Sequence, residues 1–308
     1  MNRLMDRRLL IVAGKGGVGR TTVAAALARA ASRRGKRVLL AQTNAPERLG
    51  RLLGLGTAIG PSVTAIDDRL YAVNMTPKTA LHEYGLLLLK YEPLYRVIFE
   101  NKAVRSFLGA FPGLDYWTML GKTWWHTTEM VDGKPKYDLV VLDGPASGHA
   151  VAMLRIPDAV RQAMPMGPLA RDAGLARALL SDPTRTSVVL VTLPEELPAR
   201  ETVNLARDIR TLAISLGVLV VNAMPPAEAA DPAVEKLLAA ASSASPSVEL
   251  CGILAGASVL AARRHDADRI VEGLAGDPGL PMIQLPRLPT GDLGPEEIAA
   301  LADILGQQ

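Results

Sequence analysis

Short, continuous apolar runs recur along the chain, and longer segments with apolar residues at helical spacing separate them. Apolar runs without alternation are typical of strands that are buried on both faces of a sheet. The predicted strands are Leu9–Ala13, Val38–Thr43, Leu70–Met75, a run within Tyr137–Asp143, Ser187–Pro194, Gly217–Pro226 and a last one within Pro281–Pro289. The pattern predicts an α/β fold with a parallel sheet covered by helices on both faces, and ligands at the carboxyl ends of the strands.

A glycine-rich loop and two hydroxyl side chains follow the first predicted strand, in the run LLIVAGKGGVGRTT from Leu9 to Thr22. Its glycines are expected to take positive φ angles and bring successive N–H groups close to a polyphosphate; they are Gly14, Gly16, Gly17 and Gly19. The alanine-rich segment that follows predicts a helix whose positive N-terminal end points at the same anion. The run matches the phosphate-loop pattern G-x-x-x-x-G-K-[ST], except that Arg20 holds the lysine position. An ordinary glycine turn is the weaker alternative, because strand, glycines, hydroxyls and helix coincide.

An acidic residue closes another predicted strand. Asp143 ends the apolar run of YDLVVLDGPASG and precedes a turn of small residues. A carboxylate at the carboxyl end of a buried strand is placed to meet Mg²⁺ or an attacking water near bound phosphates. Asp143 is therefore a candidate metal-facing and catalytic residue.

The segment from 76 to 137 interrupts the alternation of strands and helices. All twelve aromatic residues lie between Tyr71 and Tyr137, and stretches such as Val104–Leu120 have apolar residues at helical spacing. We expect a separately packed helical subdomain over 76–137, joined by helices near 157–183, and a nucleotide-binding domain over 1–75 and 138–308. Whether the aromatic residues form a groove for a client protein or partner, or only a local core, stays open.

Composition and charge place the chain among ordinary globular proteins. It has 308 residues, of which 49% are hydrophobic and 21% charged. The net charge of +3 hides an asymmetry, because residues 1–60 carry twelve Lys or Arg against Asp6 and Glu47. The basic cluster from Arg33 to Arg37 ends a predicted helix, where cations complement the dipole, so solvated charge is favoured over a nucleic-acid contact.

Targeting and cysteine patterns point to the cytoplasm. The longest apolar runs are too short or too interrupted to span a membrane, and the N-terminus does not resemble a secretory signal. Cys251 is the single cysteine, which excludes an intrachain disulfide framework and any cysteine-only metal site within one subunit. We expect it to be a small buried hydrophobe.

The loop resembles the deviant phosphate loop K-G-G-x-G-K-[ST] of dimeric ATPases such as MinD, ParA and ArsA, because Lys15 follows its first glycine. The resemblance implies a dimer that closes around Mg-ATP. It also implies that Lys15 reaches the partner subunit's nucleotide, that Thr21 holds Mg²⁺ and that Thr22 touches phosphate. The implied nucleotide-binding set in the loop is Gly14, Lys15, Gly16, Gly17, Val18, Gly19, Arg20, Thr21 and Thr22.

Further motifs make the chain similar to the ArsA family, which includes arsenite-pump ATPases and the ATPase that targets tail-anchored membrane proteins. DGPASGH (Asp143–His149) resembles the family's D-T-A-P-T-G-H switch II, and VTLPEELPARET resembles its V-T-x-P-E strand and helix. Asn222 resembles the asparagine that reads adenine, and the loop with Pro286 and Leu288 resembles the adenine-side loop. No N-K-x-D motif for guanine is present, so ATP is preferred over GTP.

Departures from the family pattern put hydrolysis in doubt. Asn44 stands where the family's switch I has an aspartate, and an amide cannot take a proton. Arg20 replaces the loop lysine with a planar guanidinium on a longer stem. The C-x-x-C of the zinc-bridged dimer and the cysteines that would hold arsenite are absent.

Two functions follow from the resemblance. One is an ATP-driven switch, in which a dimer hydrolyses ATP slowly, with Lys15, Asn44 and Asp143 at the catalytic site, and presents an apolar groove to a client protein or a hydrophobic helix. The other is a hydrolysis-deficient regulatory subunit that pairs with an active paralogous ATPase. A positioning ATPase of the MinD type is weaker, because the C-terminal PEEIAALADILGQQ is acidic.

Overall fold

The computed structural model describes residues 2–45, 48–89, 113–242, 247–289 and 291–307. Within these ranges eight strands form one sheet in the order β10-β9-β8-β1-β7-β2-β4-β3. Neighbouring strands are parallel, except that β3 runs antiparallel to β4. The strands are β1 (Leu9–Gly14), β2 (Val38–Thr43), β3 (Thr64–Ala65), β4 (Leu70–Met75), β7 (Leu139–Asp143), β8 (Thr186–Thr192), β9 (Leu216–Met224) and β10 (Met282–Pro286), and a separate short hairpin joins β5 (Met130–Val131) to β6 (Lys134–Pro135).

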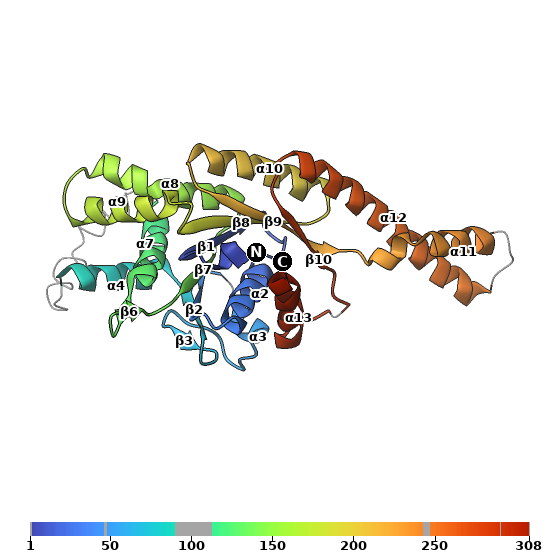
Figure 1. Cartoon of the computed structure of the whole chain (residues 1–308), viewed down its shortest axis with the longest axis horizontal. Coiled ribbons are helices and arrows are strands. Elements are labelled where there is room, and N and C mark those ends of the chain that lie inside the picture. The colour runs from blue at the N-terminus through green and yellow to red at the C-terminus, as the bar shows by residue number, and fades with distance from the viewer. Residues whose placement is uncertain (1, 46–47, 90–112, 243–246, 290, 308) are drawn as a thin grey trace.

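Helices cover both faces of the sheet (Figure 1). One face carries α7 (Leu114–Thr128), α8 (Ser147–Ala163), α9 (Pro168–Ser181), α10 (Glu196–Thr211) and the second half of α12 (Val248–Gly276). The other carries α1 (Asn2–Met5), α2 (Arg20–Arg33), α3 (Leu49–Leu52) and α13 (Pro295–Gln307). The remaining described helices are α4 (Pro77–Leu89), η1 (Ala227–Ala230) and α11 (Pro232–Ser242).

The continuous apolar strands serve both of these layers. In β1, Leu9, Ile11 and Ala13 pack against the α7–α10 side, whereas Leu10 and Val12 pack against the α2 side. Successive side chains of a strand point to opposite faces, so a strand covered on both faces needs apolar residues at every position. The predicted fold class, an α/β parallel sheet covered on both faces, is confirmed.

The aromatic residues that the structure describes do not form a core of their own. Trp117 of α7 and Tyr137 are each 1% exposed and belong to the same cluster as Ile11 and Leu142 of the sheet. Tyr71 meets Tyr137 edge to face, with ring centroids 5.5 Å apart. Residues 90–112 lie outside the described residues, so much of the expected helical segment does too, and the division into two domains stays a prediction.

Two local expectations differ from the structure. The helical stretch expected from Pro157 begins ten residues earlier, at Ser147, and Pro157 lies inside α8. A proline inside a helix removes one hydrogen bond, but here Met153, Ile156 and Val160 are buried, and that packing outweighs the loss. Cys251 is exposed on α12, so its expected burial is wrong. Among the described helices, none combines the length and apolar composition that crossing a bilayer requires.

The packing of α7 on the sheet leads to a stability prediction. Trp117→Ala removes a side chain that is 1% exposed and leaves a cavity, so we expect it to lower the free energy of unfolding by roughly 3–5 kcal/mol. Trp125→Ala, on the same helix but 39% exposed, is the matched control and should lower the free energy of unfolding by less than about 1 kcal/mol. Denaturant unfolding of both variants measures the difference, and equal losses would contradict the packing described.

Candidate functional site

The candidate site lies at the carboxyl ends of β1, β7 and β2, where three polar side chains meet. The Thr21 hydroxyl, in the first turn of α2, donates to Asp143 Oδ2 over 2.6 Å. Gln42 of β2 donates from Nε2 to the same oxygen over 3.1 Å. Parallel register places Gln42 directly beside Asp143. The fold thus brings together a hydroxyl, a carboxylate and an amide from three segments that are distant in the sequence.

Asp143 is the buried charge of this group. It is 4% exposed, and burial raises the pKa of its carboxyl group. The hydrogen bonds from Thr21 and Gln42 and the positive charge of Arg20 act in the opposite direction. Its second oxygen, Oδ1, is buried without a hydrogen-bond partner, and so is Oε1 of Gln42. Buried acceptors without a donor, on two side chains that contact each other, indicate a place for a cation or a donor that is not part of the protein.

These oxygens fit Mg²⁺. The ion prefers hard oxygen ligands and uses one or two carboxylates together with waters and phosphate oxygens. Asp143 Oδ1 and the Thr21 hydroxyl are of this kind, and Gln42 Oε1 adds a third oxygen that the sequence analysis did not name.

The glycine-rich loop joins β1 to α2, and the structural reason for a glycine differs from one position to the next. Gly17 and Gly19 have φ angles of 88° and 90°, as expected. The expectation of positive φ is wrong for Gly14 and Gly16, which are absent from the positive-φ glycines. Gly14 is required by space, because a Cβ there would lie 2.3 Å from the carbonyl oxygen of Val191 in the neighbouring strand β8. A Cβ on Gly16 would meet nothing within 4 Å.

The first turn of α2 points free N–H groups at this edge. Gly19 caps the helix, and the residues after it are Arg20, Thr21 and Thr22, all partly exposed. The first N–H groups of a helix have no partner within it and carry the positive end of the dipole. Val18 of the loop is 1% exposed and packs in the α2-side core, so it holds the loop against the sheet. The arrangement suits a phosphate group.

Arg20 folds back onto the loop. One of its terminal nitrogens donates to the carbonyl oxygen of Gly14 over 3.0 Å. Burial lowers the pKa of the guanidinium, and the charge of Asp143 opposes this shift. The residue still carries its charge at neutral pH, since arginine starts from so high a pKa. The position of the loop lysine therefore holds a cation tied to the loop backbone.

Lys15 lies in an ion pair within its own chain. Its Nζ is 2.7 Å from Oε1 of Glu201 on α10, and both side chains are about one third exposed, at 29% and 36%. Partly exposed pairs of this kind contribute about 0–1 kcal/mol, so the contact is readily exchanged. The structure thus gives Lys15 a partner that the sequence analysis did not name.

The residues predicted to contact adenine lie on β9 and on or just after β10, at the carboxyl ends of these strands. Asn222, near the end of β9, donates from Nδ2 to the carbonyl oxygen of Val18 over 2.9 Å. A Cβ on Gly19 would lie 2.2 Å from that amide nitrogen, so the loop and Asn222 are in tight contact. Pro286 ends β10 beside Met224 of β9, and Leu288 follows, packed against the α2-side core. Asn222 thus contacts the loop directly, and Pro286 ends the strand next to β9.

Asn44 does not join the cluster around Asp143. It is exposed, has a φ of 41°, and its main-chain N–H donates to the carbonyl oxygen of Met75 over 2.7 Å. The preceding Thr43 donates its hydroxyl to the Asp143 main-chain oxygen over 3.0 Å, which ties the end of β2 to the end of β7. Glu47, whose carboxylate could replace the missing one, lies outside the described residues.

Sequence reasoning missed two residues of the site. Gln42 had a signal, because it is a lone amide in the otherwise apolar strand VLLAQT and is only 1% exposed. Glu201 had none, since it is one of several acidic residues in PEELPARET on a helix that nothing in the sequence turns toward the loop.

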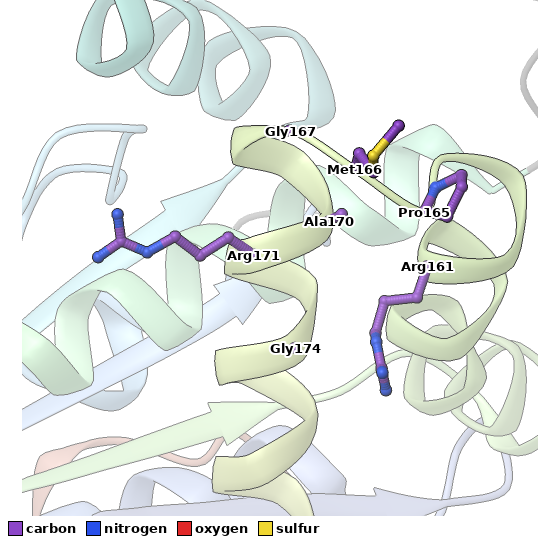
Figure 2. Close-up of a pocket in the computed structure, with 7 residues that line it drawn as sticks. All are labelled: Arg161, Pro165, Met166, Gly167, Ala170, Arg171 and Gly174. Carbon is purple, nitrogen blue, oxygen red and sulfur yellow. The ribbon is translucent and has the colours of Figure 1, made fainter.

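A separate hollow of about 500 Å³ lies where α8 turns into α9. Figure 2 shows that Arg171 extends to one side of α9 while Arg161 descends from α8 on the other, so the two guanidinium groups do not converge. Met166, at the turn between the helices, is 86% exposed. The hollow is lined by Arg161, Pro165, Met166, Gly167, Ala170, Arg171 and Gly174.

Similarity to known proteins agrees with this geometry. The chain matches the family model of anion-transporting ATPases over residues 7–175 and 170–244. The ATPase BagA of Mycobacterium tuberculosis H37Rv is 28% identical over 232 residues, which cover 73% of this chain and 68% of BagA. An arsenical pump-driving ATPase of Acidiphilium multivorum is 28% identical over 239 residues, which cover 71% of this chain and 40% of that protein.

A further arsenical pump-driving ATPase, from Escherichia coli, is 27% identical over 236 residues, which cover 71% of this chain and 40% of the pump protein. The matched region of the family model contains the glycine-rich loop, Gln42, Asp143, Glu201 and Asn222, which are the residues that meet at the carboxyl edge of the sheet. The chain is therefore a divergent member of the ArsA family of anion-transporting ATPases, with the α/β fold of a P-loop ATPase.

Proposed function

We propose that the protein binds Mg-ATP at the carboxyl edge of the sheet and uses binding and slow hydrolysis to drive a conformational switch. The observation that carries this proposal is the buried Asp143 carboxylate, with one oxygen unpartnered and the other bonded to Thr21 at the start of α2. A carboxylate and a hydroxyl there would hold Mg²⁺, which neutralises charge on the β- and γ-phosphates. The loop from Gly14 to Gly19 and the free N–H groups of α2 would hold the phosphates.

Recognition of the base is assigned to the neighbouring strand ends. Asn222 lies near the end of β9 in contact with the loop, and Pro286 and Leu288 lie at and just after the end of β10, the strand next to β9. The amide of Asn222 offers both a donor and an acceptor, which is what an adenine edge requires. Binding would exchange its present hydrogen bond to Val18 for one to the base.

Dimer closure is the second part of the proposal, with a second copy or a paralogous ATPase as the partner subunit. Lys15 now pairs with Glu201 at the surface of one chain, in a contact of little net free energy. The triphosphate of a partner's nucleotide carries more negative charge than one carboxylate and would compete for the ammonium group. Release from Glu201 would then accompany engagement with the partner.

The route from the nucleotide to the helical part runs through switch II. Asp143 ends β7, and α8 starts four residues later at Ser147. His149, in the first turn of α8, hydrogen-bonds through Nδ1 to the Tyr116 hydroxyl of α7. A shift of Asp143 toward a bound ion would therefore be passed to α7, which packs on α8.

We place client binding on the helical part, as a hydrophobic protein segment or helix. Exposed apolar side chains support this: Met166 at the α8–α9 hollow, Leu175 on α9 and Trp125 on α7 are 86%, 46% and 39% exposed. Methionines and aromatic residues adapt to varied apolar partners.

A second candidate is a regulatory subunit that binds ATP, hydrolyses it poorly and pairs with an active paralogous ATPase. Asn44 favours it, because an exposed amide occupies the place at which the family's switch I has a carboxylate. Arg20 favours it too, since its guanidinium is tied to the Gly14 carbonyl.

The buried carboxylate predicts opposite effects on stability and on metal binding. Because burial raises the pKa of Asp143, the folded protein binds that proton more tightly than the unfolded chain, whose carboxyl titrates near 3.8. Ionisation therefore costs stability as the pH rises above 3.8. Asp143→Asn should raise the melting temperature of the nucleotide-free protein by a few degrees at pH 7, for a gain on the order of 1 kcal/mol, and the gain should shrink toward low pH.

The same variant should lose the part of nucleotide stabilisation that depends on Mg²⁺. For the unsubstituted chain, Mg-ATP at 100 times its dissociation constant should stabilise the fold by about 2.7 kcal/mol. Asp208→Asn makes the same change at an exposed position of α10 and should keep the full response. If thermal unfolding shows the full Mg²⁺-dependent rise in melting temperature for Asp143→Asn, the assignment of the metal site is wrong.

Slow hydrolysis is expected to come chiefly from Asn44. Loss of a positioned base typically costs ~10² to 10⁴ in rate, so the double variant Asn44→Asp with Arg20→Lys should hydrolyse ATP at least about tenfold faster than the native chain in single-turnover assays. Asn204→Asp, the same change at an exposed position of α10, should leave the rate unchanged. Brisk native turnover that Glu47→Gln abolishes would contradict this account.

A further inference from the structure

Three buried side-chain oxygens that have no hydrogen-bond partner among the described residues lie on three neighbouring strands. They are Oδ1 of Asp143 at the end of β7, Oε1 of Gln42 in β2 and Oδ1 of Asn74 in β4. Gln42 is the direct register partner of both Asp143 and Asn74 in the parallel sheet. Register partners on neighbouring strands point to the same face of a sheet. We call these three oxygens the acceptor row.

The acceptor row faces the side of the sheet that α2 covers. Side chains two positions apart on a strand share a face. The residues two positions before the row on each strand pack in the α2-side core, and they are Leu40, Ala72 and Val141. The row therefore extends from the Asp143 site, under the start of α2, toward β4.

The orientation of both amides is fixed by acceptors on their other side. Gln42 Nε2 donates to Asp143 Oδ2 over 3.1 Å, and Asn74 Nδ2 donates to the carbonyl oxygen of Ala45 over 3.0 Å. Turning either amide over would place its oxygen against another acceptor. The amide oxygens of Gln42 and Asn74 are therefore the atoms left to face the row.

A row that consists only of acceptors suits a cation better than a water molecule. A buried water typically makes about three hydrogen bonds, so it needs donors as well as acceptors around it. The side-chain donors of Thr21, Gln42 and Asn74 already serve other acceptors. A cation needs only oxygen atoms.

We infer that Gln42 Oε1 and Asn74 Oδ1 bind a monovalent cation, Na⁺ or K⁺, beside the Asp143 carboxylate. A single charge fits because two of the three oxygens belong to neutral amides, and carbonyl oxygens of this kind replace the hydration shell of K⁺ in proteins. Divalent ions are usually held by several charged ligands. Among the described residues, no group of three or more His, Cys, Asp or Glu side chains could hold a metal ion.

Strand spacing favours an ion larger than Mg²⁺ between Gln42 and Asn74. Neighbouring strands lie about 4.8 Å apart. Two oxygens on opposite sides of one ion are about 4 Å apart for Mg²⁺ and about 5 Å apart for Ca²⁺. Na⁺ has nearly the ionic radius of Ca²⁺, and K⁺ is larger. An amide oxygen has two lone pairs, so Gln42 Oε1 can face this ion and also the Mg²⁺ proposed at Asp143.

The ion would brace the segment that follows β2. Asn74 holds the carbonyl oxygen of Ala45 through its nitrogen, and Ala45 follows Asn44 directly. An ion on Asn74 Oδ1 would fix the amide from its other end. This site needs no nucleotide, so its test is independent of the function proposed above.

Thermal unfolding of the nucleotide-free full chain in EDTA tests this inference, with choline chloride holding the ionic strength at about 0.15 M. Replacing choline by Na⁺ or K⁺ should raise the melting temperature by at least about 2 °C, because an ion that binds only the folded chain stabilises it. Equal melting temperatures in all three salts would overturn the inference. A chain that responds to Ca²⁺, in a sample without EDTA, but to neither monovalent ion would also overturn it.

Two variants of Asn74 separate the ion from the hydrogen bond to Ala45. Asn74→Leu and Asn74→Asp both lose the donor, but only Asn74→Asp keeps an oxygen in the acceptor row. Asn74→Leu should lose the ion-dependent rise in melting temperature, and Asn74→Asp should keep or increase it. Asn204→Leu, the same change at an exposed position of α10, should respond as the native chain does. Loss of the response in both Asn74 variants would contradict coordination by the oxygen.

Relaxation of ²³Na gives a readout on the native chain that needs no variant. Na⁺ bound to the slowly tumbling folded chain should relax faster than free Na⁺, and K⁺ added at constant ionic strength should displace it. Enhanced relaxation that K⁺ does not reverse, or that Asn74→Leu retains, would place the bound Na⁺ elsewhere and overturn the inference.

Discussion

Burial of the Asp143 carboxylate at the end of β7 costs free energy, and the surrounding elements are arranged so that this cost is partly offset. Thr21 and the charge of Arg20 come from the first turn of α2 and Gln42 comes from β2, so two segments contribute to one group. The offset is incomplete, since Asp143 Oδ1 has no partner. A protein that keeps such a carboxylate gives up stability at a place where an ion can restore it.

The parallel sheet is what allows these segments to meet. Because β1, β2, β7 and β9 run in the same direction, their carboxyl ends share one edge of the sheet. Residues as far apart in the sequence as Gly14 and Asn222 therefore lie at the same edge. Close contacts then fix the loop: Gly14 against the Val191 carbonyl and Gly19 against Asn222. The same edge starts α8, whose His149 contacts Tyr116, so the site and the helical layer share one element.

Much of this could be predicted from the sequence, because its strands are apolar at every position and its loop has a recognisable pattern. The sequence predicts that Thr21 and Asp143 both hold Mg²⁺, Thr21 from the loop pattern and Asp143 from its place at a strand end, and their side chains are in contact. Other features depend on packing that no local pattern reveals. Gly14 is needed because of Val191, 177 positions away, and α8 extends through Pro157 because its buried face outweighs one lost hydrogen bond. Free cysteines are usually buried, but Cys251 is exposed on α12.

Isothermal titration of ATP into the native chain, with Mg²⁺ and with the metal chelated, tests the central claim most directly. The account predicts one adenine nucleotide bound per chain, with affinity that rises when Mg²⁺ is present, because the Asp143 and Thr21 oxygens need the ion to meet a triphosphate. A correctly folded chain that binds no adenine nucleotide, or binds it equally well without the metal, would contradict it.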